Sequence, residues 1–203
     1  GAYITNTTPT IEFQVKDADS GVNAGTIAVT VDGTAVSTVT KTAIDGGYKC
    51  TCTSPTLKDG SHTISVKASD NDGNAAVAKT ATFTVDTVPP TLQITAPSND
   101  LVTNKKTVTI TGKTDDVTSK PVTVTVNGAT VTVGTDGTFT KEVTLVEGAN
   151  TITIVAKDKA GKTTTVTRKV TVDTSAPVIK SITLTPNPVD CGKTFIIAVE
   201  ITD

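Results

Sequence analysis

The side chains of this protein that could carry out chemistry are mainly aspartates, which gather at corresponding places in its two halves. The first group is Asp17, Asp19, Asp70 and Asp72, and the second group is Asp115, Asp116 and Asp158. Carboxylate oxygens are hard ligands, and Ca²⁺ takes about six to eight such oxygens. The spacing matches no calcium-loop motif. The alternative is that these aspartates cap their own turns through hydrogen bonds from side chain to backbone.

Other side chains suited to catalysis or metal binding are few, because the chain has one His and three Cys. Cys50 and Cys52 alternate with polar residues, so both thiols are expected to point into a core, and residues two apart on a strand rarely form a disulfide. Cys191 is left over. His62 falls in a different predicted strand and adds too few ligands for a zinc site. No arrangement of Ser, His and Asp repeats between the halves, so we expect no enzymatic activity.

The composition points to strands and limits the classes of partner. Of the 203 residues, 46 are Thr and 27 are Val, and β-branched residues favour strands over helices. Aromatic residues make up only 3% of the chain, so a core must consist of Val, Ile, Leu and Ala. The net charge is −2, with Lys and Asp interspersed, which excludes a polybasic surface for nucleic acid. No apolar run is long enough for membrane insertion.

The sequence repeats itself with a period long enough for a whole domain. Residues 59–90 align with residues 147–177, so that Asp70 corresponds to Asp158 and, after one gap, Asp86 corresponds to Asp173. A third copy begins after Pro177. A repeat of this length indicates tandem domains and not a solenoid of short units.

Short alternating segments separated by turn signals predict an all-β fold, with antiparallel sandwiches in an elongated array. In the second unit, strands are expected near residues 91–95, 106–112, 121–126, 129–133, 137–144, 149–157 and 163–172. Val122, Val124 and Val126 alternate with Thr, so these valines share one face of a strand. Asn127-Gly128 and Asp32-Gly33 each stand between two such runs, which predicts tight hairpin turns.

The repeat divides the chain into units at 1–86, 87–173 and 174–203. The first unit lacks the strand equivalent to 91–95, and the third contains only its first two strands. Pro89-Pro90 and Ala176-Pro177 suit short, stiff linkers after the final strand of a unit. Two strands alone are marginal in water. Either the third unit continues in a longer chain, or residues 178–202 complete a sheet in another molecule by strand addition.

The expected topology brings acidic loops of two units to one junction. In a sandwich, the loop after the second strand and the loop before the last strand lie at the same end. The last strand of the first unit ends at Asp86, close to that end of the second unit. Asp86, Asp115, Asp116 and Asp158 are therefore the candidate ligands of a Ca²⁺ ion that would stiffen the junction. No other cofactor is expected.

The aligned segments carry a resemblance to known modules. LVEGANTITIVAKDKAGKTTTVTRKVTVD (145–173) and VNGATVTVGTDGTFTKEV (126–143) resemble the immunoglobulin-like (Ig-like) module found beside glucodextranase and in large Gram-positive surface proteins. KDADSGVNAGTIAVTVDG (16–33) and LKDGSHTISVKASDNDGNAA (57–76) are similar to a related bacterial Ig-like module. ITLTPNPVDCGKTFIIAVEI (182–201) is similar to short Ig-like segments in phage structural proteins.

This resemblance implies a non-enzymatic spacer or adhesion segment of a larger extracellular bacterial protein, secreted or on the cell surface. The alternatives are a phage virion protein with exposed Ig-like domains, as part of a tail or a capsid decoration, and an accessory segment of a secreted glycoside hydrolase. The expected partners are flanking domains of a longer chain and, for adhesion, glycans or proteins of a cell wall or host cell. Strand addition by residues 178–202 would make self-assembly a further mode of association.

Overall fold

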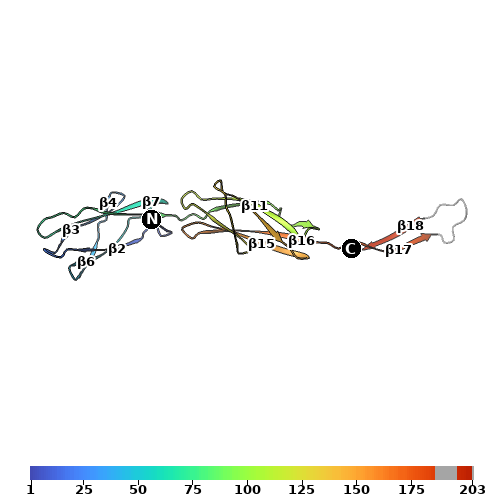
Figure 1. The fold of residues 1–203 in the computed structure, drawn as a ribbon, viewed down its shortest axis with the longest axis horizontal. Coiled ribbons are helices and arrows are strands. Elements are labelled where there is room, and N and C mark those ends of the chain that lie inside the picture. Colours follow the sequence, from blue (N-terminus) through green and yellow to red (C-terminus); the bar gives the residue numbers. More distant parts are fainter. Residues whose placement is uncertain (186–195, 203) are drawn as a thin grey trace.

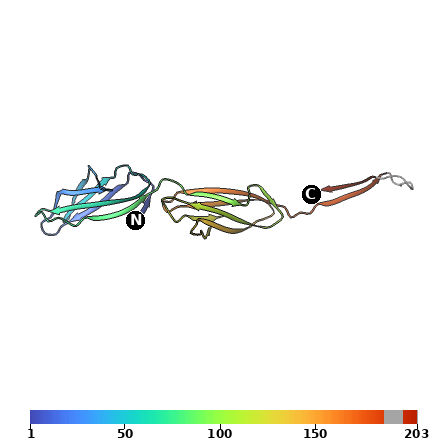
Figure 2. The same ribbon diagram turned by 90° about the horizontal axis from the view of Figure 1, so that it is seen from above.

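The computed structural model describes residues 1–185 and 196–202, which form an elongated all-β molecule (Figure 1). Two sandwiches follow each other along the long axis, and a two-stranded hairpin follows the second (Figures 1 and 2). No helix within the described residues has the length and hydropathy that crossing a bilayer requires. The prediction of tandem β-sandwiches is confirmed.

The first sandwich contains eight strands. They are β1 Ala2–Ile4, β2 Thr10–Lys16, β3 Val22–Val31, β4 Thr34–Ala35, β5 Thr40–Ile44, β6 Gly47–Thr53, β7 Gly60–Asp70 and β8 Lys79–Val85. One sheet has the order β1-β8-β7-β3-β4 and the other has the order β2-β6-β5. Neighbouring strands are antiparallel except β1 and β8, which run parallel, so the first and last strands of the sandwich lie side by side.

The second sandwich also has eight strands. They are β9 Thr91–Ala96, β10 Leu101–Thr103, β11 Thr107–Asp115, β12 Thr123–Val126, β13 Ala129–Val131, β14 Thr138–Thr144, β15 Gly148–Lys157 and β16 Thr163–Val172. They repeat the plan of the first sandwich, except that β9 is added beside β11 and, among the described residues, no strand corresponds to β5. The sheets have the orders β10-β16-β15-β12-β13 and β14-β11-β9, and β10 runs parallel to β16 as β1 does to β8. Among the described residues, β2 has no neighbour on the edge where β11 pairs with β9.

Each sandwich buries an apolar layer of its own between its sheets. In the second sandwich, Val122, Val124 and Val126 are at most 7% exposed while Thr123 faces solvent, as the alternation predicted. Ile110 on β11 and Ile154 on β15 are completely buried in the same cluster. Branched aliphatic side chains from both sheets fill this layer. Since the core has few aromatic rings, the burial of these aliphatic side chains is the main source of its stability.

Two hairpin turns occur at the expected dipeptides. Asn127 and Gly128 have φ values of 48° and 80°, and Asp32 and Gly33 have φ values of 50° and 80°. Positive φ at both central residues is characteristic of the type I′ turn, whose twist matches that of the paired strands. The turns connect β12 with β13 and β3 with β4, which confirms both predictions.

Replacing Gly128 with Val should destabilise the second sandwich by about 1–2 kcal/mol, because a β-branched residue is strained at positive φ. A Cβ at this position would meet no atom within 4 Å, so the expected cost is conformational and not steric. Thermal unfolding followed by circular dichroism measures the effect. Thr130→Val in the same hairpin is the control, since Thr130 is exposed on a strand. Equal melting temperatures for Gly128→Val and the parent would contradict the turn assignment.

Matching polar contacts hold the segment that leaves each sandwich. The Asp59 carboxylate accepts hydrogen bonds from the backbone N–H of Thr87 at 3.1 Å and from its hydroxyl at 3.0 Å. At the equivalent place, Glu147 accepts from the N–H of Thr174 at 2.9 Å and from its hydroxyl at 2.7 Å. Pro90 is less than 2% exposed. The linker between the sandwiches is therefore anchored on both sides.

The C-terminal hairpin consists of β17 (Val178–Thr185) and β18 (Ile196–Thr202), paired antiparallel. Ile179 faces Ile201 and Ile182 faces Val199, and these four side chains are 46–64% exposed. One face of the hairpin is thus apolar and open to solvent. Both strands lie in the unit predicted at 174–203. For residues 178–202, continuation in a longer chain and strand addition to another molecule both stay predictions. Cys191 lies outside the described residues.

Candidate metal centre at the domain junction

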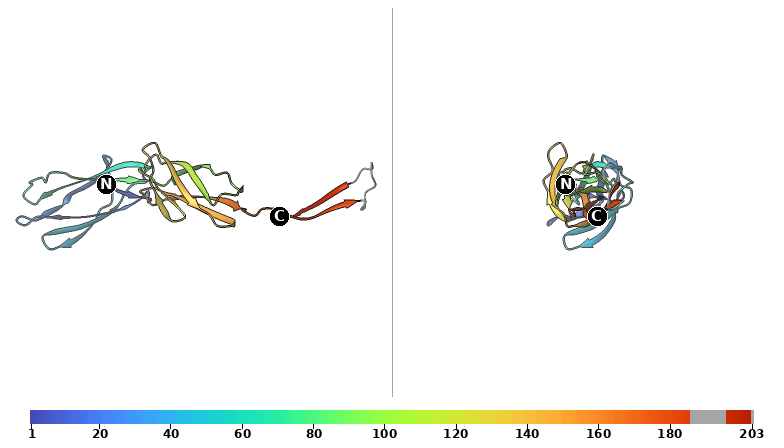
Figure 3. Two further views of the ribbon diagram at one scale, coloured as in Figure 1. Left: turned by 45° about the vertical axis from the view of Figure 1, so that its right-hand side comes forward. Right: turned by 90° about the vertical axis from the view of Figure 1, so that its right-hand side faces the viewer.

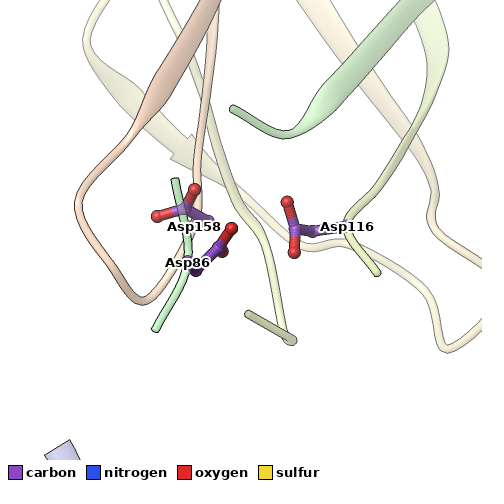
Figure 4. Close-up of side chains that lie close together, drawn as sticks. All are labelled: Asp86, Asp116 and Asp158. Atoms are coloured by element: carbon purple, nitrogen blue, oxygen red, sulfur yellow. The ribbon is translucent and has the colours of Figure 1, made fainter. Parts of the chain in front are cut away.

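Three aspartates from three different loops meet between the sandwiches. Asp86 follows β8 of the first sandwich, whereas Asp116 follows β11 and Asp158 follows β15 of the second. One carboxylate oxygen from each lies within 4.8 Å of the other two, and Figure 4 shows the three side chains close together, with Asp116 across from Asp86 and Asp158. Their exposures are 0% for Asp86, 6% for Asp116 and 5% for Asp158. The arrangement concentrates three carboxylates in a space largely closed to solvent.

Each carboxylate is oriented by a turn of its own loop. Asp86 Oδ1 accepts a hydrogen bond from the backbone N–H of Val88 at 3.1 Å, and Asp158 Oδ1 accepts from the N–H of Lys162 at 2.9 Å. Asp116 Oδ1 accepts from the N–H groups of Thr118 at 2.8 Å and of Ser119 at 2.6 Å. The turn-capping role proposed from the sequence is therefore present at all three positions, and it uses one oxygen of each carboxylate.

The second oxygens of Asp86 and Asp158 are buried and accept no hydrogen bond. The hydroxyl of Ser119, in the same turn as Asp116, is also buried without a hydrogen-bond partner. Buried polar groups in native proteins are nearly always satisfied, so each such atom requires an explanation. Sequence reasoning did not single out Ser119, since only its complete burial distinguishes it from the other serines.

Asp115, the fourth candidate ligand from the sequence, is not part of this cluster. It is the last residue of β11 and its side chain is 59% exposed, with Oδ1 at 2.8 Å from Lys120 Nζ. This hydrogen bond from Lys120 is the main cause that lowers the pKa of Asp115. Among the described residues, the ion pairs of Lys and Arg include none with Asp86, Asp116 or Asp158. The buried carboxylates therefore have no basic side chain as a partner there.

At the opposite end of the first sandwich, hydrogen bonds occupy the aspartates of the corresponding loops. Asp70 is the counterpart of Asp158, and both of its carboxylate oxygens accept hydrogen bonds from Asn74. The backbone N–H of Asn74 donates to Oδ1 at 2.7 Å, and its side-chain amide donates to Oδ2 at 2.8 Å. In the second sandwich, Lys162 stands where Asn74 stands and contributes only its backbone N–H. Asp17 is occupied by the N–H of Gly21 at 2.7 Å.

His62 forms hydrogen bonds within the first sandwich, and Cys50 and Cys52 lie in its core. Nδ1 of His62 lies 2.6 Å from Asp32 Oδ2, and Nε2 lies 2.8 Å from the carbonyl oxygen of Lys58. Cys50 and Cys52 are 0% and 4% exposed, which confirms that both thiols point into the core, and burial raises the pKa of each. Asn150, at the corresponding position of the second sandwich, also forms hydrogen bonds with backbone groups.

Comparison with protein families finds two matches, one for each sandwich. Residues 2–87 match the family described as bacterial Ig-like domain, and residues 90–174 match the family described as glucodextranase, domain B. The junction aspartates thus come from both matched regions: Asp86 lies one residue before the end of the first, and Asp116 and Asp158 lie in the second.

One curated protein is similar in sequence, and solved structures are similar in fold. Bacillopeptidase F of Bacillus subtilis (strain 168) is 31% identical over 143 residues, which cover 70% of this chain and 10% of that protein. The chain therefore spans about a tenth of the length of this curated relative. A three-Ig structure of titin domains, in an E-to-A mutated variant, aligns with a TM-score of 0.53 at 13% identity and covers 89% of this chain and 64% of the titin chain. An I-band fragment of titin gives a TM-score of 0.51 at 13% identity, covering 89% and 65%. These two likenesses show the fold alone, and they confirm the expected Ig-like sandwich.

Proposed function

Since the chain is a tandem of a bacterial Ig-like domain and a glucodextranase domain B-like domain, we propose that it is a non-catalytic spacer segment of a larger extracellular bacterial protein. That protein is secreted or attached to the cell surface. The observation that carries this proposal is the end-to-end arrangement of the two sandwiches (Figure 3, left). In such an arrangement, each added domain extends the distance between whatever precedes and follows it.

The short linker supports a rod over a flexible tether. Only Thr87 to Pro90 separate Asp86 from β9, and the buried Pro90 packs against the second sandwich. The hydroxyl of Thr164 donates a hydrogen bond to the carbonyl oxygen of Pro90. Across the junction, Lys159 Nζ lies 5.3 Å from the centre of the Tyr3 ring, a cation–π contact between the two sandwiches. These contacts restrict bending between the domains.

The described surface offers little for stacking against sugars. A hollow of about 510 Å³ in the second sandwich is lined by Thr, Lys, Asp, Gly, Val and Pro, and none of its lining residues is aromatic. Phe83 and Phe139 are 8% and 4% exposed, so they are unavailable as stacking platforms for sugars. This favours the spacer over a glycan-binding role in adhesion.

The second candidate is an accessory segment beside the catalytic domain of a secreted hydrolase. The comparisons favour it because the matched relative is a peptidase by name and one matched family is a domain of glucodextranase. Both candidates use the same geometry, since an accessory rod also sets the distance between a catalytic domain and its neighbours. They differ in what the rod carries.

Small-angle X-ray scattering of the full chain tests the rod. A compact protein of this length has a radius of gyration of roughly 17 Å. Two sandwiches with strands of roughly 33 Å, laid end to end and followed by the C-terminal hairpin, should raise this value to at least roughly 25 Å. A monomer of compact shape would overturn the proposal.

The spacing role itself can be measured by surface display. A short epitope is attached to a bacterial surface anchor, either directly or through this chain, and access by a full-length antibody is compared. We expect the chain to increase antibody binding at equal display levels. The control carries only the first sandwich, and it should give an intermediate value. Equal access with and without the chain would contradict a spacer.

A further inference from the structure

We propose that the junction between the two sandwiches is a Ca²⁺ site, in which the carboxylates of Asp86, Asp116 and Asp158 bind one ion. Two independent observations carry this proposal. The three carboxylates converge to within 4.8 Å of one another (Figure 4). In addition, the buried Oδ2 atoms of Asp86 and Asp158 accept no hydrogen bond.

The charge of the cluster requires a counterion. Three carboxylates carry three formal negative charges, and the side chains are at most 6% exposed. Buried charges in proteins are paired or coordinate metals, because removing an ionised carboxylate from water is costly. In the described residues no Lys or Arg forms an ion pair with the cluster. A bound cation supplies the missing positive charge at its centre.

The local hydrogen bonds leave the right atoms for a metal. Turns of the three loops use Oδ1 of each aspartate, which fixes the side-chain direction. Oδ2 of Asp86 and of Asp158 stays available. At the other end of the first sandwich, the amide of Asn74 occupies the equivalent oxygen of Asp70. Oδ2 of Asp158 is therefore free because Lys162, at the position of Asn74, contributes only its backbone N–H.

The ligand chemistry selects Ca²⁺ among the common divalent cations. The cluster offers only carboxylate oxygens, with no His or Cys, which disfavours Zn²⁺. Mg²⁺ usually keeps several waters and binds one or two carboxylates, whereas Ca²⁺ takes about six to eight oxygens in flexible geometry. Water and main-chain carbonyls complete such a shell. The affinity expected for an extracellular module is roughly 10⁻⁴–10⁻³ M.

The site would couple the two domains, because its ligands come from both. Asp86 belongs to the first sandwich, and the other two belong to the second. An ion that binds all three holds the end of β8 against the loops of the second sandwich. Its loss leaves three repelling charges at the junction, so the metal-free junction should be less rigid while the sandwiches stay end to end.

Isothermal titration of CaCl₂ into the chelator-treated full chain tests the site. We expect one ion per chain, weaker binding of MgCl₂, and a melting temperature that rises with Ca²⁺ concentration. Asp86→Asn preserves the Oδ1 acceptor for Val88 and removes the charge. It should weaken Ca²⁺ binding by at least about tenfold, since changes even outside the ligand shell cause losses of 10–100-fold.

The matched control is Asp173→Asn. Asp173 is the repeat counterpart of Asp86 and accepts the same turn hydrogen bond, from the N–H of Ser175 at 3.0 Å, but its side chain is exposed. This variant should bind Ca²⁺ like the parent. Asp158→Asn is a second test at the opposite domain, should Asp86→Asn fail to fold.

Three results would overturn the proposal: no Ca²⁺ binding up to millimolar concentrations, undiminished binding by both junction variants, or equal affinity for Mg²⁺. In the metal-free state, Asp86→Asn should be at least as stable as the parent, because it relieves buried repulsion. A purely turn-capping aspartate would show no Ca²⁺-dependent difference between parent and variant. The radius of gyration tests the spacer separately, since an end-to-end arrangement persists without the ion.

Discussion

Ile154→Ala is expected to lower the free energy of unfolding of the second sandwich by about 2–5 kcal/mol, the largest single effect predicted for this chain. Ile154 is 0% exposed at the centre of β15, where it packs with Ile110 of the opposite sheet in one cluster. Truncation removes buried apolar area and leaves a cavity that rigid strands on both sides cannot close.

The two domains can be monitored separately because both tyrosines, Tyr3 and Tyr48, lie in the first sandwich and the chain has no Trp. Urea unfolding followed by far-ultraviolet circular dichroism should show a transition shifted to lower urea. Tyrosine fluorescence should keep its midpoint. Thr151→Ala on the exposed face of the same strand is the control, with an expected loss below about 1 kcal/mol. Equal losses in both variants would mean that Ile154 does not occupy the core.

Removing the ion pair between His62 and Asp32 should destabilise the first sandwich by about 1.5–3 kcal/mol, the value of a hydrogen bond to a charged group. Both ring nitrogens of His62 face oxygen acceptors, so only the imidazolium donates to both. Burial lowers the pKa of His62, but the hydrogen bonds with Asp32 and with the Lys58 carbonyl outweigh it and raise the pKa above 6.5. The hydrogen bond from His62 lowers the pKa of Asp32 below 3.8.

These directions define a pH window for stability. Because the folded pKa of His62 is raised, its contribution is complete below 6.5 and is lost as the pH rises through the folded pKa. Because the folded pKa of Asp32 is depressed, its contribution is complete above 3.8 and is lost as the pH falls through the folded pKa. The pair therefore stabilises the domain most between these limits.

Melting curves monitored by tyrosine fluorescence from about pH 5 to about pH 9 measure this window. The parent should lose stability on the alkaline side, and Asp32→Asn should flatten that loss. His62→Asn imitates Asn150 of the second sandwich, which bonds to backbone groups of its own turn. It should be insensitive to pH in this range. A parent whose melting temperature stays constant across the alkaline side would exclude a charged His62.

The fold was predictable where its signals are local. Alternation of Val122, Val124 and Val126 with Thr, together with the Asn127-Gly128 turn, gives strand, face and register from a few neighbouring residues. The strand β10 was missed, and it has only three residues. Its partner β16 is distant in sequence and runs parallel to it. Short segments that depend on a remote partner carry little pattern of their own.

For the candidate site too, only part of the arrangement was predictable from the sequence. The last strand of the first sandwich, β8, runs toward the second sandwich and ends beside Asp86, so the proximity of Asp86 to Asp116 and Asp158 follows from topology alone. The separation of Asp115 from Asp116 does not, because adjacent residues at the end of a strand point in opposite directions and nothing in the sequence says which one faces the junction. Likewise, only the structure shows that Asn74 satisfies Asp70 while Lys162 leaves an oxygen of Asp158 without a hydrogen bond.

The parallel pairing of β1 with β8 determines how the first sandwich responds to tension. The chain enters through β1 at Ala2 and leaves through β8 at Val85, and these strands run side by side in the same direction. Pulling on the two ends therefore slides one strand along the other in shear. In that geometry the hydrogen bonds of the ladder bear load together and do not open one at a time, as they would if the strands were peeled apart. The same pairing of β10 with β16 gives the second sandwich a shear-loaded ladder of its own, so resistance to stretching is built into each repeat.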